Sequence, residues 1–462
     1  MSEIIRPASA EEVAEALRRA SDARQSLVIR GAGTKSGWAR PGSHVDTILD
    51  MRQMNRILAH EHGDMTATIE AGAALRDVNA ALAVHGQTLP LDPPFADRAT
   101  IGGLLATNDS GPLRHRYGTP RDLVIGIQLA TTDGVLAKAG GQVVKNVAGY
   151  DLSKLVTGSF GSLAAIVSAT FKLAPLPAAS KTMKVGVRDA STAAAIVRTM
   201  MSSQLEPVAF EVVSSQFEPV AFEVISRRST QNSQNTQPNQ FSPSSAGSAL
   251  YVVVRFASLP AVVDAQILQA TTALGPHATD IEIVEGDAER ALWDAHATAI
   301  WDLPVAIVRA SWLPANTAAV LAGLKACATD ASTATDATTS TDAATTTDAG
   351  ATTDAAATTD AAPTTVAATT GVAQGLSPAL VGRAAIGAGL LGIGGGTATQ
   401  ASAIERLRAA AVFGNIVIVR GSDELKAAVD VWGSHGDRQP LFDSLKRAFD
   451  PNGVLNAGRG PL

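Results

Sequence analysis

The sequence predicts an α+β fold in which a loop-rich N-terminal region precedes a region of strands and helices. Glycine-rich loops follow short apolar strands between residues 26 and 170, and Pro175 and Pro177 then interrupt the chain. After these prolines, β-branched runs alternate with alanine-rich stretches, as in a small antiparallel sheet covered by helices. A chain of 462 residues is long enough for two or three domains with separate cores.

The first region contains recognisable helix and strand patterns. Residues 9–20 predict a helix, because Ser9 is a suitable N-cap and apolar residues recur at helical spacing after it. Residues 26–30 and 66–70 predict strands, and residues 76–85 predict an alanine-rich helix.

The second region predicts strands at 181–187, 250–256 and 305–312. The most apolar stretch, 379–396, is interrupted by Arg383 and diluted by glycines, so it falls short of the roughly 20 apolar residues of a membrane span. We expect a buried strand and turn there.

Two stretches are not expected to belong to the packed structure. SSQLEPVAFEV at 202–212 recurs as SSQFEPVAFEV at 214–224, before a tract rich in Gln, Asn and Ser. Residues 328–370 carry an aspartate every six residues among Thr and Ala, with almost no large apolar side chain. A calcium-binding repeat would need glycine turns and more acidic groups. We therefore expect disordered insertions at about 213–248 and 328–372.

Composition excludes several classes of function. The net charge of −6, the lack of a basic run and the few aromatic residues argue against a nucleic-acid partner. Cys327 is the only cysteine, so the chain alone cannot form a disulfide or hold an iron–sulfur cluster. The N-terminal residues lack the pattern of a secretory signal. We expect a cytoplasmic protein, peripheral to the inner membrane at most through partners.

The first motif with chemical meaning is Arg30-Gly-Ala-Gly-Thr-Lys-Ser36, directly after a predicted strand. Small residues let backbone N–H groups approach an anionic phosphate, and an ordinary strand–turn is the alternative. The motif lacks the spacing of a P-loop. It also lacks the third glycine of the dinucleotide fingerprint, where Ser36 stands, and leaves no room for a crossover helix before Asp50.

Further motifs follow in the same region. Residues 99–111 pair two glycines with Asn108 and Ser110, which suits close backbone approach to a flat ligand. Residues 117–122 and 140–163 add further turns, the latter reading GGQVVKNVAGYDLSKLVTGSFGSL.

In this order and spacing, segments 30–34, 100–111, 117–122 and 145–163 resemble an FAD-binding domain. It is the domain shared by p-cresol methylhydroxylase (PCMH), vanillyl-alcohol oxidase and D-lactate dehydrogenases. The string at 140–163 is most similar to the FAD-binding E subunits of bacterial glycolate oxidases. The tail LFDSLKRAFDPNGVLNAGR, at 441–459, resembles the closing helix and turn of that family, with Ala457 where the family usually has Pro.

The resemblance implies a PCMH-type FAD-binding domain of two α+β subdomains at 1–178. It implies a cap domain at 179–404, built of an antiparallel sheet plus helices and interrupted by the two insertions. Residues 405–462 would form a C-terminal helix and a tail that returns to the flavin.

Carried over residue by residue, the resemblance implies a set of contacts to FAD. Members that link the flavin covalently through the first loop carry a His where Thr34 stands, so we expect non-covalent FAD. Lys145 either stabilises the reduced flavin ring or merely contacts phosphate or solvent. The implied cofactor-binding residues are Arg30, Gly31, Ala32, Gly33, Thr34, Lys35, Thr100, Gly102, Gly103, Asn108, Ser110, Gly111, Lys145, Gly158, Gly161, Ile166 and Asn456.

The implied function is oxidation of glycolate, or another 2-hydroxy acid, to the oxo acid within a glycolate dehydrogenase complex. A sister flavin subunit would carry most of the chemistry, and an iron–sulfur subunit would pass electrons to quinone. The alternatives are a self-sufficient FAD-dependent dehydrogenase of a small hydroxy acid or alcohol, and a subunit that holds FAD without catalysis.

No catalytic residue is identified from the sequence. Arg309, Arg383 and Arg420 are candidates to bind a substrate carboxylate. His60 and His62 are expected in an exposed loop at Gly63-Asp64, and no metal site is expected.

Overall fold

The computed structural model describes residues 2–38, 40–41, 44–141, 151–215, 249–324, 379–456 and 458–461. The expected insertions lie outside these residues, except for 213–215, which continue a strand of the second region. Lys145 and Cys327 also lie outside the described residues.

A small parallel sheet and one helix open the chain. The sheet has the order β1 (Glu3–Ile5), β3 (Thr47–Asp50), β2 (Leu27–Arg30). Helix α1 (Ala10–Asp22) covers it, and the Ser9 hydroxyl caps this helix by accepting from Glu12 N at 3.2 Å. The helix predicted at 9–20 and the strand predicted at 26–30 are confirmed.

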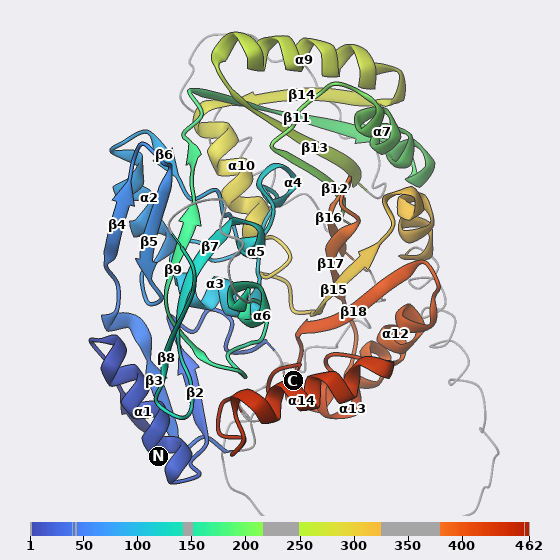
Figure 1. Cartoon of the computed structure of the whole chain (residues 1–462). Coiled ribbons are helices and arrows are strands. Elements are labelled where there is room, and N and C mark those ends of the chain that lie inside the picture. Colours follow the sequence, from blue (N-terminus) through green and yellow to red (C-terminus); the bar gives the residue numbers. More distant parts are fainter. Residues whose placement is uncertain are drawn as a thin grey trace, which may run out of the picture.

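An antiparallel sheet of five strands forms the second layer of the N-terminal region (Figure 1). Strand β9 is buried along almost its whole length, because its side chains enter the core under α1 on one face and the core under α3 on the other. The sheet order is β4 (Ile57–Glu61), β5 (Thr66–Glu70), β9 (Ala165–Lys172), β7 (Val124–Ala130), β8 (Leu136–Gly140).

Short elements connect and cover this sheet. Helix α2 confirms the helix predicted at 76–85. The expectation of an exposed loop at His60 is wrong, because His60 is half-buried in the edge strand β4, while His62 lies in the turn that follows. The connecting elements are α2 (Leu75–Ala83), β6 (Gln87–Thr88), α3 (Ile101–Thr107), α4 (Arg114–Tyr117), α5 (Pro120–Leu123), α6 (Leu152–Val156) and β10 (Ala174–Pro175).

The second region is one antiparallel sheet of eight strands with helices packed on it (Figure 1). This confirms the expected α+β class. The strands, in sheet order, are β14 (Asp280–Glu285), β11 (Ala179–Val187), β13 (Ala249–Ser258), β12 (Ala209–Ser215), β16 (Ala379–Arg383), β17 (Ala388–Ile393), β15 (Ala306–Trp312) and β18 (Phe413–Arg420). The helices are α7 (Ala190–Ser202), α9 (Pro260–Leu274), α10 (Gly286–Thr298), α12 (Thr397–Ala409) and α13 (Asp423–Ala428).

The C-terminal part of the chain contributes to both regions. Residue 404, the expected end of the cap, lies within α12, and β18 after it pairs with β15 in the eight-stranded sheet. The apolar stretch 379–396 forms the buried hairpin of β16 and β17, as predicted. In the part of the chain that the structure describes, no helix is long and apolar enough to cross a membrane.

The tail returns to the first strand region after α14 (Gln439–Phe449), the predicted closing helix. Leu27 N donates to Val454 O at 2.8 Å, and Asn456 N donates to Leu27 O at 2.9 Å. Asp450 is 2% exposed and accepts from Val454 N, Leu455 N and Lys446 Nζ at 2.6–3.0 Å. This carboxylate therefore fixes the turn that lays the tail against β2.

We expect Asp450→Ala to destabilise the protein by about 3 kcal/mol or more, since it leaves two buried backbone N–H groups without their acceptor and removes the anion that pairs with Lys446. The midpoint of urea denaturation would measure the loss. Asp443→Ala is the matched control, because Asp443 lies exposed on α14, the helix that ends just before Asp450. Equal midpoints for the two variants would contradict this role of Asp450.

Candidate functional site

A cleft lies where the loop after β2 faces α3, the turn at Phe160-Gly161 and the tail. We call it the glycine-loop cleft. It is lined by Val28, Ile29, Arg30, Gly31, Ala32, Gly33, Thr34, Lys35, Ser36, Trp38, Met51, Ala71, Thr100, Gly102, Gly103, Ala106, Thr107, Phe160, Gly161, Ala164, Ile166, Asn456 and Arg459.

Two glycines let the segments that line the cleft approach one another closely. A Cβ at Gly31 would lie 2.1 Å from Thr100 Oγ1, so only glycine lets the loop reach the start of α3. Gly161 has a φ of +70°, and a Cβ there would lie 2.7 Å from Asn456 Nδ2. These positions bring backbone N–H groups to the cleft wall without side chains in between, which suits an anionic ligand.

Asn456 carries a hydrogen-bonding group that protein atoms do not satisfy. Its backbone takes a left-handed conformation, with φ of 43°, and its Nδ2 donates to Phe160 O. Its Oδ1 is buried and has no hydrogen-bond partner among the described residues. Because such an acceptor is costly to leave unpaired, it fits a donor group on a bound ligand.

Ion pairs join the glycine loop to the second region. Asp109 is 3% exposed, and its two oxygens lie 3.3 Å from Lys35 Nζ and 3.4 Å from Arg309 Nη2. The Arg309 guanidinium lies 5.2 Å from the centre of the Trp38 ring, which stacks on Trp301 at 5.4 Å. The loop is therefore held against β15 by both charge and aromatic contact.

A second cavity, of about 320 Å³, adjoins the glycine-loop cleft, and we call it the Arg309 cavity. The two share Trp38, Thr107 and Phe160 as lining residues. The other lining residues are Asn108, Gly158, Arg309, Asn415, Val417, Ile418, Val419, Trp432, Ser434, His435, Arg438, Phe442 and Pro461.

Arg309 and His435 give the Arg309 cavity its acid–base character. Burial lowers the pKa of the Arg309 guanidinium, but Asp109 opposes the shift, and an arginine keeps its charge in any case. Burial also lowers the pKa of His435 below its ordinary 6.5. The cavity therefore presents the Arg309 guanidinium, the exposed Arg438 guanidinium and a neutral imidazole near pH 7.

The structure brings most of the implied cofactor-binding residues together. Asn108 and Gly158 line the Arg309 cavity instead of the cleft. Ser110 and Gly111 line neither, because Ser110 O accepts from Arg383 Nη2 at 2.7 Å and Gly111 packs on the Asp92 backbone. The implied residues that line the cleft are Arg30, Gly31, Ala32, Gly33, Thr34, Lys35, Thr100, Gly102, Gly103, Gly161, Ile166 and Asn456.

A buried polar group lies between the two regions, beyond both cavities. Glu211 is fully buried, with Arg383 Nε and His296 Nε2 each 3.7 Å from one of its oxygens. Burial raises the pKa of nearby Asp92 to about 7, although its Oδ2 accepts from Leu113 N. The group contacts the N-terminal region where Arg383 Nη2 donates to Ser110 O at 2.7 Å.

Sequence reasoning missed His435, Trp38 and Phe160 as lining residues. His435 follows β18 by 15 positions and belongs to no motif, so no local pattern indicates it. Trp38 lies two residues after the motif that ends at Ser36. This position next to the motif was the only sequence signal that Trp38 lines the cleft.

The comparisons with known proteins agree with this geometry. Residues 1–140 match the family model described as an FAD binding domain. The chain is 32% identical over 208 residues to glycolate oxidase subunit GlcD of Bacillus subtilis, which covers 45% of this chain and 44% of that protein. It is 36% identical over 171 residues to glycolate oxidase subunit GlcE of Escherichia coli, covering 37% of this chain and 48% of that one. The matches span less than half the length of each relative.

The fold as a whole is similar to that of a solved alkyldihydroxyacetonephosphate synthase, with a TM-score of 0.65. The similarity covers 98% of this chain and 75% of the synthase at 16% identity, and it concerns the fold alone. FAD, the cofactor expected from the sequence, is supported by the domain match. Two features of the cleft are compatible with bound FAD: the buried Asn456 Oδ1 without a hydrogen-bond partner, and the close approach of the backbone at Gly31 to Thr100.

We expect Gly31→Ala to lose most of its bound FAD, because the new Cβ would push the loop away from Thr100. The ratio of flavin to protein absorbance after gel filtration measures the occupancy. Gly37→Ala, in the same loop with no atom within 4 Å of its Cβ, should keep its FAD. Full occupancy in Gly31→Ala would show that the cleft is not the flavin site.

Proposed function

We propose that this chain is the FAD-binding subunit of a dehydrogenase complex that oxidises glycolate, or a closely related 2-hydroxy acid, to the 2-oxo acid. The observation that carries the proposal is the Arg309 cavity, which adjoins the glycine-loop cleft and holds a guanidinium and a neutral imidazole. The names of the two relatives, both glycolate oxidase subunits, support the same substrate class.

Oxidation of a 2-hydroxy acid removes a hydride from the α-carbon and a proton from the hydroxyl, so that a C=O bond forms. FAD, when bound, supplies the acceptor for the hydride. The protein must then hold the carboxylate and take the hydroxyl proton. The cavity must also be large enough for a five- to six-atom acid, and about 320 Å³ is sufficient.

Arg309 is the best of the three candidate arginines for the carboxylate. Arg383 is 8% exposed, donates to Ser110 O and lies beside the Glu211 carboxylate. The Arg420 guanidinium donates to the carbonyls of three residues in the segment before β15, at Trp301, Leu303 and Val305. Arg309 alone of these three lines the cavity, and its side chain is 34% exposed.

His435 is the proposed base. Its ring packs edge-on against Phe442 at 5.0 Å, which holds the imidazole at the cavity wall. Since burial lowers its pKa, the neutral form that can accept the hydroxyl proton predominates at pH 7.

Electrons would leave the reduced cofactor through a partner. An iron–sulfur cluster needs several thiolates, and this chain has one cysteine. An iron–sulfur subunit, a sister flavin subunit and quinone remain the proposed route. The expected division into an FAD domain at 1–178, a cap and a returning tail also stays a proposal, as does non-covalent attachment of FAD.

Anaerobic addition of glycolate to the protein, purified with its partners, should bleach the flavin absorbance, with D-lactate as a second test acid. Bleaching of the isolated chain would favour the self-sufficient dehydrogenase. Flavin that stays oxidised with both acids, with and without partners, would favour a subunit that holds FAD without catalysis.

We expect Arg309→Met to raise the glycolate concentration for half-maximal flavin reduction on the order of 10- to 100-fold, because a charge-assisted contact to the carboxylate is lost. FAD content is measured alongside. Arg406→Met, at an exposed position on α12, is the control. An unchanged half-maximal concentration in Arg309→Met would rule out this arginine as the anchor.

His435→Gln should slow flavin reduction about 10²- to 10⁴-fold while FAD stays bound. In the unchanged protein, the rate should rise with pH through a pKa below 6.5 and then stay level, because only the neutral imidazole accepts a proton. His277→Gln, outside both cavities, should behave as the unchanged protein. A rate that shows no fall on the acid side of pH 6.5 within the range where the protein stays folded, or a His435→Gln variant of normal rate, speaks against His435 as the base.

A further inference from the structure

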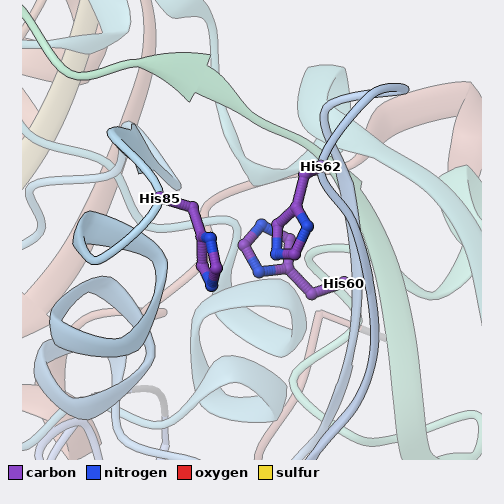
Figure 2. Close-up of side chains that lie close together, drawn as sticks. All are labelled: His60, His62 and His85. Carbon is purple, nitrogen blue, oxygen red and sulfur yellow. The ribbon is translucent and has the colours of Figure 1, made fainter.

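Three histidines meet at the outer edge of the five-stranded sheet (Figure 2). His60 lies in the edge strand β4, His62 in the turn after it, and His85 in the turn between α2 and β6. One ring nitrogen of each lies within 4.8 Å of the others. None of the three lines the glycine-loop cleft or the Arg309 cavity.

The three rings pack against one another, as Figure 2 shows. The centres of the His62 and His85 rings are 3.8 Å apart, and those of His60 and His62 are 4.2 Å apart. In a tetrahedral site with metal–nitrogen bonds of about 2.0–2.1 Å, the nitrogens would be roughly 3.3 Å apart. His62 and His85 are exposed, so their side chains can rotate to turn one nitrogen of each toward a common point, which also separates rings that now stack closely.

Gln87 fixes the His60 ring through a hydrogen bond. This glutamine is 8% exposed, and its Nε2 donates to His62 O at 2.8 Å. Its Oε1 therefore faces His60 Nε2, 2.8 Å away, and accepts from an N–H there. The opposite nitrogen, Nδ1, then carries the lone pair. A hydrogen bond of this kind behind the ring is typical of a metal-bound histidine.

We propose that His60, His62 and His85 form a binding site for a divalent transition-metal cation of the Zn²⁺ class. Three neutral imidazoles suit zinc and its neighbours, whereas Mg²⁺ and Ca²⁺ prefer oxygen ligands. A fourth position stays open to water or an external ligand. Bound metal would tie the turn after β4 to the turn before β6, and so would clamp the edge of the sheet independently of the proposed oxidation.

The test is titration of the full-length, tag-free protein with Zn²⁺ in a calorimeter, with Co²⁺ absorption as a second probe. We expect one equivalent of Zn²⁺ to bind at micromolar concentration or below, and to raise the melting temperature. His62→Gln and His85→Gln should each weaken binding about 100-fold or more. His44→Gln and His277→Gln remove histidines elsewhere and should leave it unchanged, and FAD content should be the same in all variants.

Gln87→Met tests the orientation of His60 with all three ligands kept, and should weaken Zn²⁺ binding about 10- to 100-fold. The proposal is overturned if the unchanged protein binds no Zn²⁺ saturably, or if binding is as tight in His62→Gln and His85→Gln. In that case the three rings form only an aromatic cluster at the sheet edge.

Discussion

A buried carboxylate bridges the two regions at the point where the cleft meets the cavity. Asp109 follows α3 and lies between Lys35, in the glycine loop, and Arg309, in the eight-stranded sheet. A carboxylate that is 3% exposed is stable as an anion only when cations compensate the lost hydration, and these two come from opposite regions. The pairing sets the glycine-loop cleft beside the Arg309 cavity, and the stack of Trp38 on Trp301 excludes water from the same junction.

The cleft itself is an arrangement of backbone from distant parts of the chain. The loop after β2, the start of α3, the turn at Phe160 and the tail at Asn456 contribute to it. Hydrogen bonds between backbone groups hold these segments, as when Phe160 N donates to Ala106 O at 2.8 Å. Asp450 adds a charged anchor for the tail. Because the wall is made largely of backbone and small side chains, its shape is set by packing outside the cleft.

The three arginines named from the sequence illustrate how environment assigns roles. All lie on strands of the eight-stranded sheet, yet Arg420 satisfies backbone carbonyls and Arg383 joins a buried polar group with Glu211. Arg309 keeps its guanidinium at a cavity wall. Identical side chains therefore serve folding in two cases and are available to a ligand in the third, according to which groups surround them.

The sequence by itself determined the α+β class and the strands at 26–30 and 66–70, because period-two alternation and capping residues are local signals. It indicated the cofactor through the resemblance of four segments, in fixed order, to an FAD-binding domain. It also indicated most residues of the cleft, as segments in fixed order. Only the tertiary structure decided that Ser110 and Gly111 turn away and that His435 lines the second cavity. It alone brought His85 to His60 and His62. These contacts join residues far apart in the chain, and no local pattern encodes the distance between side chains that meet through packing.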